Sequence, residues 1–466
     1  MKIKFTPYKA YNALSTESNK LMPAKSIYFI GIGGIGMSAI ARYYKSLGYK
    51  VSGYDKTQTE LTDKLIEEGI LVHFTDDVNL VDRDAELVVY TPAVPTEHKE
   101  LNFFKQNNFN LKKRSEVLGD LTKPLYSICV AGTHGKTTTS CMVAHILRDS
   151  GYGCNAFLGG VATNYNTNFW ASDNKVAVAE ADEYDRSFLQ LNPDIAIITS
   201  MDPDHLDIYG TEENMQDAFI SFSKNIETDG VLICKNNIER IDEFFPNKIT
   251  YSLADQTADC FAENVSIKNG AYYFDVSLKG KLIKDFCLNM GGGHNVENVI
   301  AAIAAASKLE IEEGKIKKAV ASFKGVKRRF EYVIKNEDFI FIDDYAHHPR
   351  ELSALISGTK EMFPDKKVTV IFQPHLFSRT RDLAEGFSNA LDMADEIILL
   401  PIYPARELPI ENVSSKSIAE TMTKKVLLIE KEDLIETIKF MKPEVLITAG
   451  AGDIDKLVKP LKNIFS

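Results

Sequence analysis

The 466-residue sequence lacks long apolar runs, and this absence excludes one broad class of protein. No stretch approaches the ~20 consecutive apolar residues that a helix needs to cross a bilayer, so membrane insertion is not expected. The first 25 residues mix Lys, Tyr, Asn and Ser without an apolar segment, which argues against a secretory signal.

Paired cysteines are also missing. Several of the cysteines lie in apolar patterns typical of strands or helices, which favours buried, reduced thiols over disulfides or a zinc site. The protein is therefore expected in the cytoplasm. The six cysteines are scattered and form no C-x-x-C pair: Cys129, Cys141, Cys154, Cys234, Cys260 and Cys287.

An excess of positive charge is absent as well. Lys and Arg number 54 against 65 Asp and Glu, a net charge of −11 with no extended basic stretch. Nucleic acid and anionic membranes are therefore poor partners. The length, in contrast, exceeds a single compact core, and a prior of ~150 residues per domain predicts about three domains.

The most informative motif is the hexapeptide Gly-Thr-His-Gly-Lys-Thr at residues 132–137. It follows an apolar run at 125–130 and opens a helical pattern. A glycine turn between strand and helix presents backbone N–H groups to phosphate, lysine neutralises charge, and a hydroxyl ligates Mg²⁺. The spacing is shorter than G-x-x-x-x-G-K-[ST], but the context predicts ATP binding. An ordinary glycine turn would leave Lys136 and Thr137 unexplained.

A second glycine motif, Gly-Ile-Gly-Gly-Ile-Gly, occupies residues 31–36. It stands between an expected strand at 27–30 and an expected helix at 35–47, and Asp55 ends the next expected strand. Such a turn suits a diphosphate, and the carboxylate suits a ribose hydroxyl. The motif predicts diphosphate binding without identifying the nucleotide. Glycines used only for tight strand–helix packing are the alternative.

Alternating strand and helix patterns predict an α/β protein of three domains. Residues 1–121 would form a Rossmann-like domain with a parallel sheet. Residues 122–324 would form a P-loop ATPase-like domain with a β-hairpin insertion between Cys260 and Cys287. Residues 325–466 would form a second Rossmann-like domain. The charged stretch 323–330 has the composition of a linker.

Polar residues follow several expected strands of the central segment. Glu180 ends the strand 176–180, and a carboxylate at that end of a parallel strand is a candidate Mg²⁺ ligand. The acidic residues at 182–185 could equally form a solvated loop. His205, in an acidic turn at 202–207, could ligate a metal or make only local hydrogen bonds.

Polar clusters also follow strands in the C-terminal segment. The Asp-Asp pair at 343–344 superficially resembles a Mg²⁺-binding strand end, but it lies in a different predicted domain from the phosphate loop, so Glu180 is preferred. The histidines at 347–348 would point to opposite faces of a strand and suit zinc poorly. Arg379 and Arg381 could clamp a carboxylate or simply begin a helix in solvent.

Taken in this order, the motifs resemble those of the Mur ligase family of ATP-dependent peptide-bond synthetases. The resemblance extends from residue 27 to about residue 454. Each motif alone is weak, but seven in register are specific. They are Gly-Ile-Gly-Gly-Ile-Gly-Met-Ser (31–38), Gly-Thr-His-Gly-Lys-Thr-Thr-Thr (132–139), Asp-His-Leu-Asp (204–207), Gly-His-Asn-x-x-Asn (293–298), Asp-Asp-Tyr-Ala-His-His-Pro (343–349), Phe-Gln-Pro-His (372–375) and Gly-Ala-Gly-Asp (450–453).

The resemblance implies one substrate for each domain: a UDP-linked sugar, ATP and an amino acid. The reaction would join L-alanine to the lactyl carboxylate of UDP-N-acetylmuramate through an acyl phosphate, releasing ADP and phosphate for peptidoglycan precursor synthesis. A related ligase that adds a peptide or another small amino acid is the alternative. A monomer or weak homodimer with small-molecule partners is expected.

The resemblance also implies roles for individual residues. Catalysis would depend on Lys136, His205 and Arg329. The UDP substrate would contact Gly33, Gly34, Ile35, Gly36, Met37, Ser38 and Asp55. ATP would contact Gly132, Thr133, His134, Gly135, Lys136, Thr137, Thr138, His294, Asn295, Asn298, Arg329 and Asp344. The amino acid would contact Tyr345, His348 and Arg379. Mg²⁺ would be held by Thr137, Glu180 and His205.

Two positions depart from the pattern of related ligases. Several members place a carbamylated lysine after the metal-binding histidine, where this sequence has Phe219 and Ile220, so no such modification is predicted. Some members have a basic residue where Leu376 stands, which leaves more of the carboxylate recognition to Arg379.

Two other classes of protein remain as alternatives. A nicotinamide-dependent oxidoreductase could use the 31–36 motif and Asp55, but it would leave the Lys-Thr pair at 136–137 unexplained. A nucleotide-sensing regulatory module would not need polar clusters after strands of three segments. For a ligase, domain closure is expected, with candidate hinges at residues 123–124 and Gly325.

Overall fold

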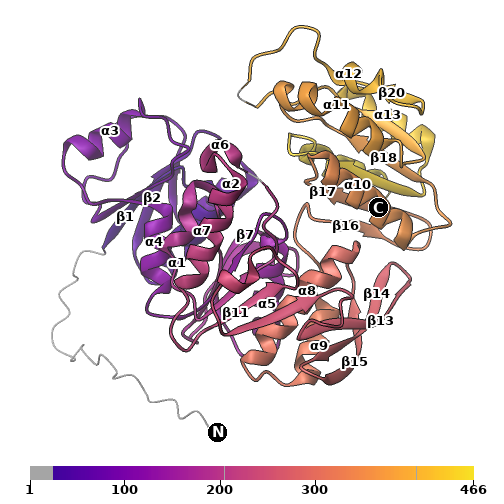
Figure 1. Cartoon of the computed structure of the whole chain (residues 1–466). Helices are drawn as coiled ribbons and strands as arrows, with labels where there is room; N and C mark the ends of the chain where they lie inside the picture. Colours follow the sequence, from indigo (N-terminus) through magenta and orange to yellow (C-terminus); the bar gives the residue numbers. More distant parts are fainter. Residues whose placement is uncertain (1–24, 204, 406, 466) are drawn as a thin grey trace.

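The computed structural model describes residues 25–203, 205–405 and 407–465. They form three α/β domains in chain order, each built on one sheet (Figure 1). The fold class expected from the sequence is confirmed. The predicted limits at 121/122 and 324/325 stay predictions, and residues 1–24 of the first predicted domain lie outside the described part.

The N-terminal domain contains a five-stranded parallel sheet in the order β3-β2-β1-β4-β5. The strand order reverses between β1 and β4, and open α/β sheets bind ligands in the crevice at such a point. All five residues of β1 are buried, as expected for a parallel strand covered on both faces. The elements are β1 (Ser26–Ile30), α1 (Ile35–Ser46), β2 (Lys50–Tyr54), α2 (Glu60–Glu67), β3 (Leu71–His73), β4 (Leu87–Tyr90), α3 (Lys99–Gln106), β5 (Leu111–Lys113) and α4 (Arg114–Thr122).

The central domain contains a ten-stranded sheet in the order β15-β14-β13-β12-β11-β10-β6-β9-β7-β8. The strand before the phosphate loop, β6, lies between β9 and β10 and pairs with both in parallel. The expected hairpins are β13, β14 and β15, which extend this sheet at one edge. The strands are β6 (Tyr126–Ala131), β7 (Asn155–Ala162), β8 (Thr167–Trp170), β9 (Val176–Glu180), β10 (Ile195–Ile198), β11 (Val231–Lys235), β12 (Lys248–Ser252), β13 (Cys260–Lys268), β14 (Ala271–Leu278) and β15 (Lys281–Leu288).

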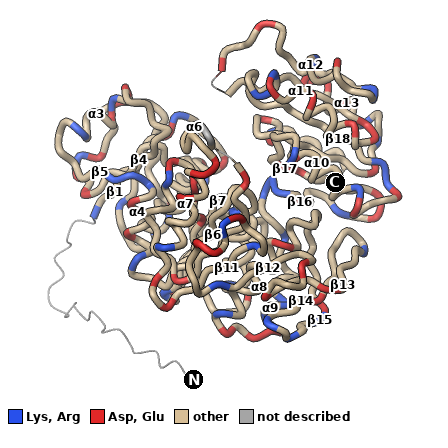
Figure 2. The backbone as a smooth tube through the Cα atoms, viewed as in Figure 1, with Lys and Arg blue, Asp and Glu red and all other residues tan. Residues whose placement is uncertain are grey.

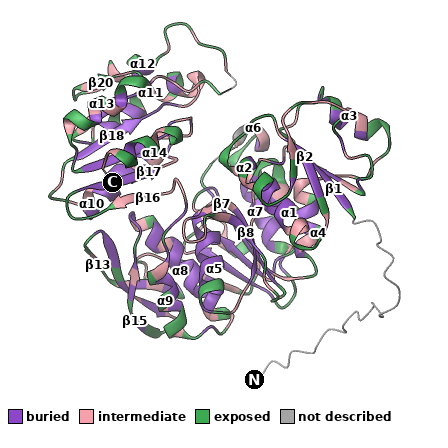
Figure 3. Cartoon of the chain, turned by 180° about the vertical axis from the view of Figure 1, so that it is seen from behind, coloured by how far each residue is buried: buried purple, intermediate pink, exposed green. Residues whose placement is uncertain are grey.

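Helices cover the central sheet and form much of the core (Figure 3). The alanine-rich α8 packs its small side chains into the same buried cluster as the apolar residues of α5. The helices are α5 (Lys136–Asp149), η1 (Tyr184–Gln190), α6 (Leu206–Tyr209), α7 (Glu212–Lys224), η2 (Ile241–Glu243), α8 (Gly293–Lys308) and α9 (Glu313–Ser322).

The C-terminal domain contains a six-stranded sheet in the order β16-β17-β21-β18-β19-β20. It is parallel except for the edge strand β16, which runs antiparallel to β17. The elements are β16 (Glu331–Lys335), β17 (Ile340–Asp344), α10 (Pro349–Met362), β18 (Val368–Phe372), α11 (Phe377–Leu391), β19 (Glu396–Leu399), α12 (Ser415–Ala419), β20 (Val426–Leu428), α13 (Lys431–Met441), β21 (Val445–Ala449) and α14 (Asp455–Ile464).

The stretch 323–330, expected to be a linker, is packed against the central domain. Its apolar residues Phe323, Val326 and Phe330 are buried. Thr163 N donates to Gly325 O at 3.1 Å, and Lys327 N donates to Val161 O at 2.9 Å. The charged composition misled the prediction because the apolar residues between the charges anchor the chain.

Figure 2 shows Lys and Arg interspersed with Asp and Glu along the described parts of all three domains. Within residues 25–465, apart from the two excluded positions, no helix is long and apolar enough to cross a membrane. The six cysteines are free thiols, and all except the half-buried Cys287 are buried.

Candidate active site

The phosphate loop joins β6 to α5 through two glycines with positive φ. Gly132 has φ 133° and Gly135 has φ 82°, and Gly135 caps the N-terminus of α5. A Cβ atom at Gly132 would overlap the Thr199 hydroxyl, and one at Gly135 would lie 2.7 Å from Asn298 Oδ1. Backbone conformation and close packing therefore both require glycine, and the first N–H groups of α5 are left to face an anion.

Residues after β10 hold the loop in place. Thr133 Oγ1 and Ser200 Oγ lie 2.9 Å apart, His134 N donates to Ser200 Oγ at 2.9 Å, and Asp202 N donates to Thr133 Oγ1 at 3.1 Å. The Thr133 hydroxyl and the His134 N–H are thus engaged within the protein. The exposed His134 ring lies 3.9 Å from the Asp202 carboxylate.

Lys136 folds back on its own loop and pairs with a buried carboxylate. Its Nζ atom donates to Gly132 O at 2.7 Å and to Glu183 Oε1 at 2.8 Å. Glu183 is 1% exposed, and its carbonyl accepts a 2.6 Å hydrogen bond from the Tyr209 hydroxyl. Burial raises the pKa of Glu183, and the charge of Lys136 opposes this. The interpretation of residues 182–185 as a solvated loop is wrong at Glu183, because this side chain points inward to the lysine.

Glu180 lies beside Thr137 at the end of β9. Its Oε2 atom is buried and has no hydrogen-bond partner in the described part of the chain. Burial raises the pKa of Glu180, while Lys136, a hydrogen bond from Thr137 and the charge of Arg329 lower it. A buried carboxylate oxygen without a protein partner is suited to accept a cation.

His205 lies near the same ion pair. Its Nε2 atom is 3.9 Å from Glu183 Oε1, and its ring packs edge-on against Tyr184. The preceding Asp204 of the 204–207 motif lies outside the described residues. The backbone of His205 has a φ of 51°, in the left-handed region, as is common at functional turns.

The side-chain oxygens near the phosphate loop are suited to a Mg²⁺ ion that is also held by substrate and water, and not to an ion enclosed by protein ligands alone. Among the described side chains, no cluster of three or more His, Cys, Asp or Glu could hold a metal ion. Mg²⁺ is usually held by one or two carboxylates together with substrate phosphates and water. The free oxygen of Glu180 beside the Thr137 hydroxyl meets that requirement.

The start of α8 supports the phosphate loop from behind. Asn295 and Asn298 are buried; Asn295 Nδ2 donates to Gly291 O at 2.7 Å, and Asn298 Nδ2 donates to Asn295 Oδ1 at 3.2 Å. Asn298 is also the residue closest to Gly135. His294, in contrast, has an exposed side chain. The buried Thr138 lies within the first turn of α5.

Where the chain passes from the central to the C-terminal domain, it contributes a basic residue, Arg329, and the end of β17 contributes a carboxylate, Asp344. The Arg329 guanidinium lies 5.3 Å from the centre of the Tyr345 ring. The Asp344 carboxylate accepts hydrogen bonds from Phe330 N at 2.6 Å and Ala346 N at 2.7 Å. Burial raises the pKa of Asp344, and the charge of Arg329 opposes this, as it does for Glu180.

A second basic cluster surrounds the start of α10 and α11. Arg379 Nη1 is buried and lacks a hydrogen-bond partner among the described residues. Burial and the charge of Arg379 lower the pKa of His348, whose Nδ1 caps α10 by accepting from Arg350 N at 3.3 Å. Arg381 is exposed and pairs with its neighbour Asp382. It thus fits the alternative that this arginine only begins a helix in solvent. The unsatisfied donor of Arg379 fits a carboxylate ligand.

The N-terminal glycine turn is partly closed by its own contacts. Gly33 N donates to Asp55 Oδ2 at 2.7 Å, which engages the carboxylate expected near a ribose. Met37 and Ser38 are buried, and Asn168 Nδ2 of the central domain donates to Ser38 Oγ at 3.0 Å. The Ser38 side chain therefore contributes to the contact between domains. The N–H groups that start α1, at residues 35–37, remain for an anion, with the backbone of Gly34 just before them.

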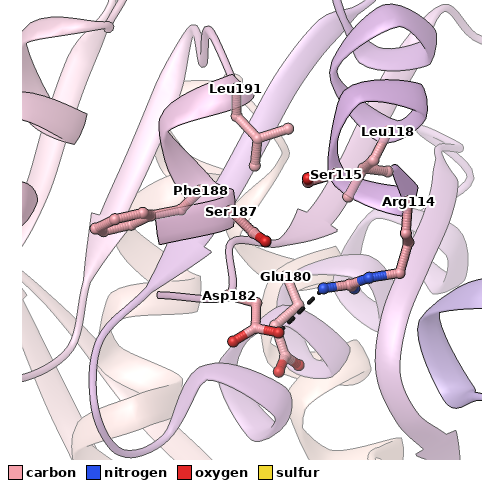
Figure 4. Close-up of a pocket in the computed structure, with 8 residues that line it drawn as sticks. All are labelled: Arg114, Ser115, Leu118, Glu180, Asp182, Ser187, Phe188 and Leu191. Carbon is pink, nitrogen blue, oxygen red and sulfur yellow. Dashed lines mark hydrogen bonds and ion pairs between the residues drawn. The ribbon is translucent and has the colours of Figure 1, made fainter. Parts of the chain in front are cut away.

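A cavity is lined both by this glycine turn and by Glu180, the candidate Mg²⁺ ligand. Its wall includes Ile35 and Gly36 from the turn, Arg114 from α4, and Glu180 and Asp182 from the central domain. Figure 4 shows a neighbouring pocket that shares Arg114, Leu118, Glu180 and Asp182 with this cavity; the Arg114 side chain is directed to Asp182, with Glu180 beside them. Arg114 was not predicted from the sequence. It directly follows the short strand β5, and residues that directly follow strands were predicted as site residues elsewhere in the chain.

The fold and the site define a three-domain nucleotide-binding enzyme in which a phosphate loop, acidic residues and basic residues converge between sheets. Comparison with known sequences agrees. Residues 26–126 match the Mur ligase family catalytic domain, residues 130–306 the Mur ligase middle domain, and residues 328–452 the Mur ligase glutamate ligase domain. The chain belongs to the Mur ligase family.

Individual relatives cover nearly the whole chain. The chain is 47% identical to a UDP-N-acetylmuramate–L-alanine ligase from Flavobacterium johnsoniae, over 95% of this chain and 98% of the relative. It is 47% identical to the protein of the same name from Cytophaga hutchinsonii, over 94% and 96%. The solved UDP-N-acetylmuramate-alanine ligase of Thermotoga maritima superposes with a TM-score of 0.82 at 30% identity, covering 94% of this chain and 99% of that chain.

Proposed function

We propose that this protein joins L-alanine to the lactyl carboxylate of UDP-N-acetylmuramate, with conversion of ATP to ADP and phosphate, as a step of peptidoglycan precursor synthesis. The relatives that support this activity cover nearly the whole chain at 47% identity. The structural observation that carries it is the continuous cavity, because one wall contains the diphosphate turn and the other contains Glu180 beside the phosphate loop. A UDP-linked acid with its diphosphate at the turn would therefore have its carboxylate on the side of Glu180.

The chemical problem is that a carboxylate is a poor electrophile in water. Transfer of the γ-phosphoryl group of ATP to the lactyl carboxylate gives an acyl phosphate, which the amine of alanine then attacks with expulsion of phosphate. Two anions must approach each other in the first step. Lys136 of the central domain and Arg329 of the C-terminal domain reduce that repulsion and stabilise the charge of the transition state.

Nucleotide and metal binding would use residues of the central domain together with one carboxylate of the C-terminal domain. Residues 132–138 would hold the phosphates, with His294, Asn295 and Asn298 toward the adenosine and Asp344 toward the ribose. Thr137, Glu180 and His205 would hold Mg²⁺. The ion supplies further neutralisation of the phosphate oxygens. We expect Lys136 to turn its Nζ atom from Glu183, which it contacts at 2.8 Å, to a phosphate oxygen of the nucleotide.

The amino acid would bind between Tyr345, His348 and Arg379. The buried, unsatisfied Nη1 of Arg379 would meet its carboxylate. Leu376 begins α11 with φ 71° and offers no charge there. Phe219 and Ile220 are buried in apolar surroundings, so the positions of the carbamylated lysine in related ligases are filled by core packing here.

The expected location of this activity is the cytoplasm, where its nucleotide substrates are made and where free thiols persist. A monomer or weak homodimer is proposed.

A phosphate-release assay tests the function directly. Purified protein is supplied with ATP, Mg²⁺ and UDP-N-acetylmuramate, together with alanine, glycine, serine or a tripeptide in parallel. We expect phosphate release that depends on both co-substrates and is fastest with L-alanine, with the product confirmed by mass spectrometry. A preference for the tripeptide would support the related peptide-adding activity instead, and release without any amino acid would contradict the ligase assignment.

A further inference from the structure

Arg114 lies where the N-terminal and central domains meet. It is the first residue of α4, directly after β5. Its Nη2 atom donates to Asp182 Oδ2 of the central domain at 3.1 Å. Its Nη1 atom lies over the start of α1, because a Cβ atom added to Gly36 would be only 2.6 Å away from it. One guanidinium thus lies between the glycine turn of one domain and the acidic loop of the other. Figure 4 shows its contact with Asp182.

The charges around the cavity make this arginine distinctive. Arg114 is its basic lining residue, and the acidic lining residues are Glu180 and Asp182. The remaining wall is largely apolar and includes Leu118 and Phe157. A substrate that carries both a diphosphate and a carboxylate is repelled by two carboxylates, so it needs a cation inside the cavity. Glycine N–H groups alone carry only partial charges.

We propose that Arg114 is a substrate-binding residue, which holds the diphosphate of the UDP substrate over the N-terminus of α1 while Asp182 keeps its guanidinium in position. Only the identity of the UDP substrate rests on the function proposed above. The guanidinium has five N–H donors in a planar fork, so it can bind a phosphate oxygen through Nη1 while Nη2 remains on Asp182. Diphosphate binding would then tie the N-terminal domain to the central domain, with the sugar directed to Glu180.

The neighbouring residue provides a matched comparison. Lys113 also makes an ion pair between the same two domains, with its Nζ atom 3.6 Å from Asp185 Oδ2. It is more exposed than Arg114 and does not line the cavity. Loss of Lys113 therefore removes one interdomain ion pair without removing a cavity cation.

The test measures binding in the absence of turnover. Titration calorimetry compares wild type, Arg114→Ala, Arg114→Lys and Lys113→Ala, with uridine, UDP, UDP-N-acetylglucosamine and UDP-N-acetylmuramate as ligands. A hydrogen-bonded charge pair is commonly worth ~1.5–3 kcal/mol, which corresponds to roughly 10- to 150-fold in affinity. We expect Arg114→Ala to lose that much affinity for all three diphosphate ligands and none for uridine. Arg114→Lys should recover part of the loss, and Lys113→Ala should bind as wild type.

Two results would overturn the proposal. Equal weakening of uridine and UDP by Arg114→Ala would show that the residue only supports the domain structure. Weakening confined to UDP-N-acetylmuramate would show that it meets the lactyl carboxylate. In steady-state assays, the KM for UDP-N-acetylmuramate should rise in Arg114→Ala while the KM for ATP stays within about threefold. A wild-type protein that binds UDP but releases no phosphate with alanine would refute the proposed function and leave the Arg114 proposal standing.

Discussion

At the scale of single residues, the contact between Lys136 and Glu183 ties the phosphate loop to the acidic loop after β9. The lysine is satisfied by a buried carboxylate and by the carbonyl of Gly132. We expect a triphosphate with Mg²⁺ to draw the lysine from this carboxylate, because it carries more negative charge. The glycines and Lys136 could be predicted from sequence because the motif is contiguous. Glu183 could not, because the direction of a side chain in an acidic loop depends on packing.

Removal of the lysine should separate binding from chemistry. We expect Lys136→Ala to reduce the rate of phosphate release by roughly 10²–10³-fold, since one preorganised cationic contact at the transition state is lost. Affinity for UDP-N-acetylmuramate should stay nearly unchanged, because its uridine and diphosphate would be held by the N-terminal domain, away from Lys136. Turnover close to that of wild type would contradict the role given to Lys136.

Glu100 predicts a pH dependence of stability in the N-terminal domain. Its side chain is fully buried, accepts a 2.7 Å hydrogen bond from the Tyr28 hydroxyl, and lies 3.6 Å from His73 Nε2. Burial raises the pKa of Glu100 to about 7 from 4.5. Between these pH values the folded state keeps a proton that the unfolded state loses, so the free energy of unfolding falls as pH rises.

Glu100→Gln should remove this slope. The variant should gain stability relative to wild type by of order 1–3 kcal/mol as pH rises from about 5 to about 8. The pKa values of His73 and His98 are lowered by burial, but these residues are present in both proteins and largely cancel in the difference. Thermal unfolding midpoints of both proteins across this pH range provide the measurement. A constant difference between them would contradict the assignment.

At the scale of elements, long apolar patterns were predictable and short ones were not. The strands β1 and β2 and the helix α1 appear where the sequence places them. The edge strands β3, β5 and β20 have only three residues each, too few to establish a period of two. Arg114 was missed for this reason, because the strand before it was not recognised.

The phosphate loop depends on its glycines in a way that one matched pair can test. Gly135 has φ 82° and packs on Asn298, whereas Gly280, in the turn between β14 and β15, has φ 81° and open space around it. Gly280→Ala should cost about 1–2 kcal/mol of stability from backbone strain and leave ATP binding intact. Gly135→Ala should suffer the same strain and also lose ATP affinity. Equal ATP affinity in the two variants would contradict a steric role for Gly135.

At the scale of the whole molecule, the C-terminal domain contacts the central domain at several places within the described residues. One is the packed chain at 323–330. A second is the turn between β13 and β14, where Gly270 O accepts from Tyr332 OH at 3.1 Å and from Lys335 Nζ at 2.8 Å. The family order of domains could be predicted from sequence, but this second contact could not, because it joins residues about 60 positions apart without a motif.

Domain closure follows from the distribution of the site over three domains. ATP, UDP-N-acetylmuramate and alanine bind in different domains in the proposed function, so bond formation requires them to approach. Small-angle scattering should show a smaller radius of gyration with a nonhydrolysable ATP analogue, Mg²⁺ and both co-substrates than with any ligand alone. Residues 123–124 and Gly325 stay the predicted hinges. An unchanged radius with all ligands present would contradict closure.

The central claim is that positive charge around the phosphate loop of the central domain allows two repelling anions to react. A crystal structure with a nonhydrolysable ATP analogue and Mg²⁺ tests it most directly. We predict the triphosphate against residues 132–137, with Lys136 Nζ transferred from Glu183 to a phosphate oxygen and Glu180 on the ion. A triphosphate bound elsewhere, with the bond between Lys136 and Glu183 intact, would contradict the account.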